Sequence, residues 1–465
     1  MVSIAERDVA KEIIVDCAQP THTIRPLHGV NGGPSNAGET IDLTNYWKEL
    51  AIPITRLHDC DWPNPAVVDM HVVFPSPTAD PEAAASYQFS RTDDYLAAIE
   101  KSGAAVVYRL GESIEHSRKK YYVHPPADFA RWADACLGII RHENEGWADG
   151  AHRHIRYWEI WNEPENRPAM WSGSDDDYDR LYVTAAKRIK EKFPDLLVGG
   201  PAVGAAGEIV EGKWRSTPFL DGFLEHCTQE HAPLDFFSWH TYTDEPQAYG
   251  IKARGIRAWL DEHGFTKTEI HLNEWNLLPK KDWGPLSPGG QGPAREKSFA
   301  EIGGISGAAF LEYVLLDLQT SPVDVANYYA GDTGAWGLFT RHGVPTKTFY
   351  AFLAFRKLLE TPDGVATHGH VTGEIAHCAG FNADKTQLNL LLSKYRGGEN
   401  DFDFTFKSIP WTGGSIAEFY LLDAQHNLDK IQTVRLGETA SKLRCTLATP
   451  GILLVRLSPA HPAGS

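Results

Sequence analysis

The chain has 465 residues, of which 42% are hydrophobic and 23% charged, a composition typical of packed globular proteins and unlike that of disordered, collagen-like or coiled-coil chains. Its formal net charge is −17, from 44 Lys plus Arg and 61 Asp plus Glu. This balance argues against a nucleic-acid or membrane partner, because binding to phosphate or to anionic lipid needs a basic excess.

From about residue 25 to residue 355, short apolar runs alternate with longer segments of helical periodicity, which is typical of parallel βαβ units. We predict eight strands, at 27–32, 53–58, 104–110, 155–161, 196–200, 236–239, 270–272 and 323–328. Helices are predicted between them, among others at 126–141, 175–193 and 303–318. This pattern predicts an α/β fold, a (β/α)8 TIM barrel. A doubly wound open sheet is the alternative, but the early VNGGPSN stretch does not match its GxGxxG phosphate loop.

The pattern changes after about residue 363, where short alternating strands are separated by turn residues. This indicates a C-terminal antiparallel β-sandwich. A further strand near Lys11–Asp16 is expected to join it from the N-terminus. The predicted organisation is therefore an N-terminal strand segment at 1–23, a catalytic barrel at 24–360 and an accessory β-sandwich domain at 361–465.

The six cysteines contain no CxxC pair and are widely spaced, so we expect buried free thiols and neither a zinc site nor a disulfide scaffold. No metal and no cofactor are expected, since no converging set of ligands and no phosphate-binding motif is visible. The N-terminal segment has no basic stretch followed by an apolar run, and no run of 18 apolar residues occurs. We therefore expect a cytoplasmic protein.

Two glutamates follow predicted strands in similar contexts. Glu163 lies in Trp-Asn-Glu-Pro after the fourth strand, and Glu274 lies in Asn-Glu-Trp after the seventh. Because the carboxyl ends of barrel strands face the active site, we expect both at the barrel mouth. A single glutamate after a strand is usually a surface or ion-paired residue. Two of them favour glycosidic bond cleavage, in which one carboxylic acid protonates the leaving oxygen and the other carboxylate attacks the anomeric carbon.

These motifs resemble glycoside hydrolase clan A. Within the clan, the sequence looks closest to family 39, best known for β-xylosidases and α-L-iduronidases. The Asn-Glu-Pro motif is specific to the clan, whereas the family resemblance rests on softer features: ITRLH at 54–58, WHTY at 239–242 and KTFYAF at 347–352. The resemblance covers the barrel motifs from 24 to 356 and the trailing sandwich. It departs at Glu165, where family xylosidases more often carry Asn.

The resemblance implies roles for individual residues. Glu163 matches the family's general acid/base and Glu274 its nucleophile. The implied substrate-binding and orienting residues are Asn162 at the sugar 2-hydroxyl, Arg56 as the buried cation beside the nucleophile, His58, His240, Tyr242, Trp275, Trp336 and Asn31. Each of these also has a plain structural interpretation, such as a core histidine, a barrel ion pair or a packing tryptophan. The rival carboxylates are Glu159, expected in a structural ion pair, and Glu165, expected outside the reacting geometry.

A Gly/Pro-rich segment, 277–301, follows the seventh strand and is expected to cover the pocket, with Trp283 reaching in. The resulting hypothesis is a retaining exo-glycosidase of carbohydrate metabolism, a β-D-xylosidase that releases xylose from the non-reducing end of short xylo-oligosaccharides. An α-L-arabinosidase or another family-39-like glycosidase is the alternative, and a non-catalytic carbohydrate-binding barrel is the alternative from another class. The sequence leaves open which sugar and which linkage are cleaved, and whether the action is exo or endo. The expected partner is a small oligosaccharide or glycoside, and family relatives are often homo-oligomers.

Overall fold

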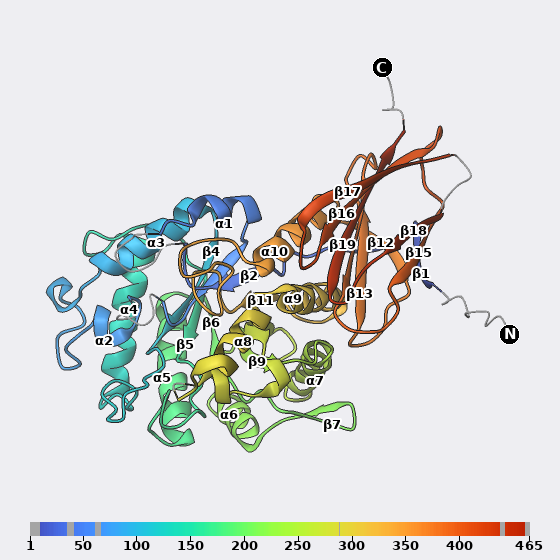
Figure 1. Cartoon of the computed structure of the whole chain (residues 1–465). Coiled ribbons are helices and arrows are strands. Elements are labelled where there is room, and N and C mark those ends of the chain that lie inside the picture. Colours follow the sequence, from blue (N-terminus) through green and yellow to red (C-terminus); the bar gives the residue numbers. More distant parts are fainter. Residues whose placement is uncertain (1–9, 35–40, 61–66, 288, 438–441, 461–465) are drawn as a thin grey trace.

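A computed structural model describes residues 10–34, 41–60, 67–287, 289–437 and 442–460. The chain forms a barrel surrounded by helices and, beside it, a large curled sheet (Figure 1). Residues 1–9 of the predicted N-terminal segment lie outside the described ranges. The predicted fold class is confirmed.

Eight parallel strands close the barrel in the order β10-β11-β2-β3-β4-β5-β6-β9. All eight predicted strands are present, several of them longer or shorter than predicted. Their bounds are β2 (Gly29–Asn31), β3 (Ile54–Leu57), β4 (Ala105–Leu110), β5 (Tyr157–Ile160), β6 (Leu197–Val203), β9 (Phe236–Thr243), β10 (Glu269–Leu277) and β11 (Val325–Tyr328). The largest extension is in β10, which continues for five residues past the predicted 270–272 run and so contains Glu274 itself.

Helices between the strands cover the outside of the barrel (Figure 1). They are α1 (Thr44–Leu50), α2 (Met70–Val73), α3 (Ser90–Ser102), α4 (Phe129–Glu145), α5 (Asp175–Lys192), α6 (Pro218–Gln229), α7 (Ala248–Glu262), α8 (Gly292–Ile302), α9 (Ile305–Asp317) and α10 (Lys347–Leu358). The residues at the start of α5 explain why a helix begins there. Ser174 and Asp177 form a reciprocal capping box, and three aspartates occupy the first turn, where the helix dipole favours negative charge.

The second part, here called the sheet domain, is one nine-stranded sheet built from both ends of the chain. Its strands are β1 (Lys11–Thr23), β12 (Asp363–His368), β13 (Ile375–Phe381), β14 (Leu388–Lys394), β15 (Asp401–Lys407), β16 (Ser415–Leu422), β17 (Asn427–Leu436), β18 (Lys442–Thr446) and β19 (Gly451–Pro459). The sheet differs from the predicted antiparallel sandwich because β1 lies between β12 and β15 and runs parallel to β15. It is therefore a mixed, curled sheet.

The middle strands of the sheet domain are buried on both faces. Along β14, Leu390 and Leu392 belong to the apolar core inside the curled sheet, whereas Leu391 joins the core of the barrel. Side chains of a strand alternate between its two faces, so one strand contributes to both cores. Helices α9 and α10 lie between the barrel and the sheet and cover the second face (Figure 1).

Two sequence expectations concern single residue types and segments. The six cysteines, all within the described ranges, are free, as expected, and four of them are buried. Among the described residues no single helix is long and apolar enough to cross a membrane. The bent pair 292–302 and 305–320 meets that test of length and composition together, and α9 in this pair packs within the protein core.

A short antiparallel hairpin, β7 (Glu208–Val210) and β8 (Lys213–Arg215), follows β6. The turn that leads into it, at 204–206, lies at the barrel mouth.

Candidate active site

The two predicted glutamates meet at the carboxyl ends of the barrel strands. Glu163 follows β5, and Glu274 lies in the last half of β10. His240, on β9, lies between them, with its Nδ1 2.8 Å from Glu163 Oε1 and 3.5 Å from Glu274 Oε2. One carboxylate oxygen of each glutamate and a nitrogen of His240 all lie within 4.8 Å of one another. The carboxylates are thus close enough to act on the same atom.

The backbone around Glu163 is held in an unusual conformation. Trp161 and Glu163 have φ values of +70° and +43°, in the left-handed region that side chains rarely adopt. The Glu163 amide donates to the Ala202 carbonyl at 3.0 Å, which ties this turn to β6. A Cβ at Gly204 would come within 2.5 Å of Glu163 Oε1, so a larger residue there would displace this carboxyl group. Such strain persists where the surroundings fix it, and here it aims the carboxyl into the mouth.

Glu274 is surrounded by hydrogen-bond donors. The Arg56 guanidinium donates to Glu274 Oε1 at 2.7 Å, and the Tyr242 hydroxyl donates to Oε2 at 2.8 Å. Arg56 is fully buried and also contacts Glu159, through Nε at 2.6 Å. Its third contact is Asn162, whose Oδ1 accepts from Nη2 at 2.5 Å. The charge of the buried Arg56 favours the ionised form of Glu274, and Glu159 is the structural ion-pair partner that the sequence indicated.

The titration properties follow from burial. Burial raises the pKa of Glu274, while His240 and Arg56 act in the opposite direction. Burial also raises the pKa of Glu163, against the effects of the Asn166 hydrogen bond and of Arg56. Because Glu274 directly contacts a permanent cation and Glu163 does not, we assign the negative charge to Glu274 and the proton to Glu163. Burial lowers the pKa of His240 to about 4, so the imidazole is neutral near pH 7.

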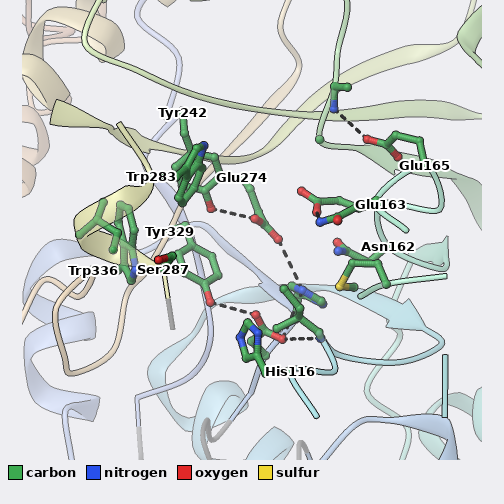
Figure 2. A pocket seen from close by; sticks show the side chains of 18 residues that line it. His116, Asn162, Glu163, Glu165, Tyr242, Glu274, Trp283, Ser287, Tyr329 and Trp336 are labelled. Atoms are coloured by element: carbon green, nitrogen blue, oxygen red, sulfur yellow. Dashed lines mark hydrogen bonds and ion pairs between the residues drawn. The ribbon is translucent and has the colours of Figure 1, made fainter. Parts of the chain in front are cut away.

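Both glutamates open into a cavity of about 840 Å³ (Figure 2). One wall is aromatic and contains Tyr242, Trp283, Tyr329 and Trp336. Tyr242 packs edge-on against both tryptophans, with ring centroids 5.2 Å from Trp283 and 5.7 Å from Trp336. The Trp283 side chain is 49% exposed and comes from the 277–301 segment, which therefore covers the cavity as the sequence predicts.

The structure separates the remaining sequence candidates into two groups. Asn162, His58, Tyr242 and Trp336 line the cavity, and His58 Nε2 is 3.8 Å from Glu274 Oε1. Two residues predicted to bind substrate lie elsewhere. Trp275 points out of the barrel and packs between Tyr249 and Tyr328, because it follows the inward-facing Glu274 on the same strand. Asn31 lies below the cavity, where its side chain donates to the Asn273 and Asn327 carbonyls.

Several cavity residues were not expected from the sequence, among them Asp59, Tyr329 and His116. Asp59 lies two residues after β3 and Tyr329 directly after β11, and the Tyr329 hydroxyl donates to Asp59 Oδ2 at 3.1 Å. Their places after strand ends would have identified both. Burial raises the pKa of Asp59 to about 6. His116 lies in the loop after β4 and has no such signal. Glu165, which the sequence placed outside the reacting geometry, also lines the cavity.

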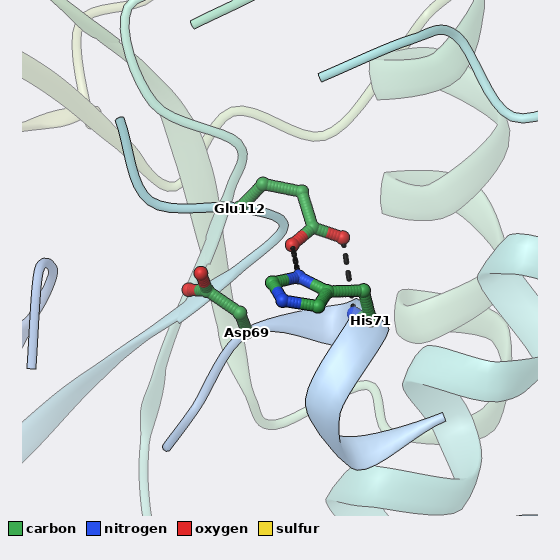
Figure 3. A group of neighbouring side chains, drawn as sticks. All are labelled: Asp69, His71 and Glu112. Carbon is green, nitrogen blue, oxygen red and sulfur yellow. Dashed lines mark hydrogen bonds and ion pairs between the residues drawn. The ribbon is translucent and has the colours of Figure 1, made fainter. Parts of the chain in front are cut away.

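Three groups of side chains in the described ranges have donors close enough to hold a metal ion: the Glu163–His240–Glu274 group, Asp93–His142–Glu143 and Asp69–His71–Glu112. The third group, which lies outside the cavity, is drawn in Figure 3. Its donors are already engaged, since His71 Nδ1 bonds Glu112 Oε2 at 2.5 Å and Asp69 bonds Arg109. We therefore derive no catalytic step through a metal.

Comparisons with known proteins agree with this geometry. The sequence model described as Glycosyl hydrolases family 39 matches residues 69–262. A beta-xylosidase of Geobacillus stearothermophilus is 26% identical over 261 residues, 51% of this chain and 48% of that protein. A beta-xylosidase of Caldicellulosiruptor saccharolyticus is 24% identical over 345 residues, 67% of this chain and 63% of that protein. The matches thus span about half to under two thirds of these relatives.

Among solved structures, a glucosidase from Croceicoccus marinus has the same fold, with a TM-score of 0.79 and 24% identity over 98% of this chain and 100% of that one. The chain therefore resembles glycoside hydrolase family 39, a retaining family of clan A.

Proposed function

We propose that this protein is a retaining exo-glycosidase and that its substrate is a β-D-xyloside, such as a short xylo-oligosaccharide. The observation that carries the proposal is the pair Glu163 and Glu274, whose closest carboxylate oxygens lie within 4.8 Å of each other and of His240. Retaining enzymes place their two carboxyl groups about 5–5.5 Å apart, whereas inverting enzymes leave roughly 6.5–9.5 Å for a water molecule.

The mechanism follows from the two environments. Glu274, held ionised by Arg56 and oriented by Tyr242, attacks the anomeric carbon. The bond to the leaving oxygen breaks as that oxygen takes the proton of Glu163. Glu163 is then a carboxylate, and it takes a proton from a water molecule that attacks the same carbon. The bond to Glu274 breaks, so the sugar is released with its original configuration and both carboxyl groups return to their starting states.

Several neighbours support these steps. Nδ1 of the neutral His240 is hydrogen-bonded to Glu163 Oε1 at 2.8 Å and so orients the acid. Asn162, fixed by Arg56, lines the cavity next to Glu163, where its amide is available to a sugar hydroxyl. The aromatic wall offers flat apolar faces to the sugar ring.

The choice of xylose rests on the two relatives named as beta-xylosidases. L-arabinosides present similar ring hydroxyls, so α-L-arabinosidase activity is the alternative. A panel of 4-nitrophenyl glycosides separates them: β-D-xyloside, α-L-arabinosides in both ring forms, β-D-glucoside, β-D-galactoside and α-L-iduronide. We expect the β-D-xyloside to have the highest kcat/KM. Preference for another sugar would overturn the choice of xylose and leave the two glutamate roles intact.

The glutamate roles are tested on the best of these substrates. Glu274→Ala should lower kcat by about 10⁴-fold or more, because no covalent intermediate forms. Glu163→Ala should retain attack on a nitrophenyl glycoside, whose leaving group needs no proton, and sodium azide should then yield a glycosyl azide of retained configuration. Glu208→Gln, on the exposed strand β7, is the matched control and should keep wild-type rates. Binding of sugar without turnover by the wild type would instead indicate a carbohydrate-binding barrel.

A further inference from the structure

A third carboxyl group lies in the cavity and has no part in the mechanism above. Glu165 stands two residues after Glu163, and its Oε1 accepts a hydrogen bond from the Ala205 amide at 2.8 Å. Its other oxygen, Oε2, is buried and has no hydrogen-bond partner among the described residues. Because Glu165 also lines the cavity, this oxygen is positioned for a ligand (Figure 2).

The position of Glu165 identifies the part of the substrate it would meet. In Figure 2, Glu163 lies between Glu274 and Glu165. The turn after β6 contacts both Glu163 and Glu165. Gly204 packs against the carboxyl group of Glu163, and the Ala205 amide donates to Glu165. The sugar to be transferred must lie on Glu274, and the leaving oxygen must lie on Glu163. Groups beyond Glu163 therefore face the leaving group.

A buried carboxyl oxygen without a partner is costly unless a ligand supplies a hydrogen bond. Burial, followed by the neighbouring Glu163, raises the pKa of Glu165 to about 7, against the effect of the Ala205 hydrogen bond. Of the other cavity residues on this side, Met170 and Ala205 offer no side-chain acceptor, and Asn166 is exposed and donates to Glu163 Oε2 at 2.9 Å. Glu165 is thus the acceptor suited to a hydroxyl of the leaving group.

We propose that Glu165 selects the leaving group: its Oε2 accepts a hydrogen bond from a hydroxyl of a second sugar, so the preferred substrate is a sugar–sugar glycoside rather than a glycoside of a simple alcohol. This inference rests on the proposed glycosidase function. A competing role is that Glu165 acts only on Glu163, by changing how readily that acid gives up its proton.

The experiment separates these roles by using two substrates with poor leaving groups that both need the proton of Glu163. Xylobiose has hydroxyls on its leaving group, and methyl β-D-xyloside has none; if the glycoside panel selects another sugar, the corresponding pair is used. The kcat/KM of each is measured for the wild type, Glu165→Ala, Glu165→Gln and the control Glu208→Gln. We expect Glu165→Ala to lose about 10- to 150-fold on xylobiose, the value of one hydrogen bond to a charged group, and less than about threefold on the methyl glycoside.

Glu165→Gln keeps an acceptor oxygen and should recover part of the loss on xylobiose. An equal loss on both substrates, accompanied by the same displacement of the basic limb of both pH profiles, would overturn the proposal and assign Glu165 to Glu163. The proposal would also be overturned if Glu165→Ala had the same ratio of kcat/KM on xylobiose to kcat/KM on methyl β-D-xyloside as the wild type. A wild type that hydrolyses no glycoside would refute the proposed function itself, whereas an active wild type with unselective variants refutes only this inference.

Discussion

At the scale of single residues, the site is organised around the charge of Glu274. Each of its carboxylate oxygens accepts one short hydrogen bond, from Arg56 at 2.7 Å and from Tyr242 at 2.8 Å. Arg56 is itself held on its other edge by Glu159 and Asn162. The proposed nucleophile is therefore fixed in orientation by donors that favour its ionised form before any substrate enters, which is the preorganisation that electrostatic catalysis requires.

Tyr242→Phe removes one of these two donors and keeps the ring in place against Trp283 and Trp336. We expect kcat/KM to fall about 10- to 150-fold, the value of a hydrogen bond to a charged group. The hydroxyl favours the ionised form of Glu274, so its loss raises the pKa of that carboxyl and moves the acidic limb of the pH–rate profile to higher pH. The profile of kcat/KM against pH measures both effects.

The control for this variant is Tyr420→Phe, which removes a tyrosine–carboxylate hydrogen bond of 3.1 Å to Glu418 in the sheet domain. It should leave the profile unchanged. A Tyr242→Phe enzyme with a wild-type acidic limb would show that the hydroxyl does not stabilise the charge of Glu274.

Most of these residues could be predicted from the sequence, for a simple reason. Glu163, Arg56, His58 and Tyr242 all lie in or just after parallel strands, and a closed barrel brings the carboxyl ends of all its strands together. Which side of a strand a residue faces is harder to predict. The pairing register of β10 shifts between Leu272 and Glu274, so simple alternation does not run through the whole strand. Beyond the shift, Glu274 faces the cavity and Trp275 packs between Tyr249 and Tyr328.

At the scale of elements, the burial of a strand decides how clearly the sequence indicates it. β17 lies at the edge of the sheet, and most of its residues, NLDKIQTVRL, are exposed. Without a buried face, no alternation of apolar and polar residues is required, so the sequence carries no period-two signal. By contrast, β14 is buried along its whole length, and its apolar run indicates a strand directly.

Helix α9 carries a buried acid in an otherwise apolar surface. Glu312 is fully buried, neither of its carboxyl oxygens has a hydrogen-bond partner among the described residues, and burial raises its pKa well above the usual value. The folded protein must therefore keep Glu312 protonated, whereas the unfolded chain ionises it at neutral pH. Because the folded state binds the extra proton, this group makes the protein less stable as the pH rises above the unfolded pKa of about 4.3.

Glu312→Gln removes this ionisation and keeps the shape of the side chain. We expect the free energy of unfolding to increase by about 1–3 kcal/mol at pH 8, and by less at pH 6, because the proton costs less at the lower pH. Urea unfolding of both proteins at the two pH values measures the difference. Glu296→Gln, on an exposed position of α8, is the control and should have no effect at either pH. If the difference in free energy of unfolding between Glu312→Gln and the wild type became smaller as the pH rises, Glu312 would not be the protonated buried acid described here.

At the scale of the whole molecule, the barrel and the sheet domain share a continuous apolar core. Ile452 and Leu454 of β19 pack into the barrel core, while their neighbours Leu453 and Val455 pack inside the curled sheet. Hydrogen bonds reinforce the contact, such as that from Ser393 Oγ to the Ala309 carbonyl of α9 at 2.6 Å. The sheet also needs both ends of the chain, because β1 pairs with β12 and β15.

This shared core predicts that the two parts unfold together. Phe404 is fully buried inside the curled sheet, so Phe404→Ala should cost about 3–5 kcal/mol through lost burial and a residual cavity. Of the 14 tryptophans, 13 lie between residues 47 and 336 and only Trp411 lies in the sheet domain, so tryptophan fluorescence reports on the barrel. In urea, the fluorescence midpoint of Phe404→Ala should therefore fall, although the substitution lies outside the barrel.

The control is Ile431→Ala, at a 41% exposed position of β17. It should change the free energy of unfolding by less than about 0.5 kcal/mol. The opposite result would be a fluorescence transition of Phe404→Ala at the wild-type midpoint, with the far-ultraviolet signal of the sheet lost at lower urea. The barrel would then be stable without the sheet domain. In that case the sheet domain would not be needed to support α9 and α10.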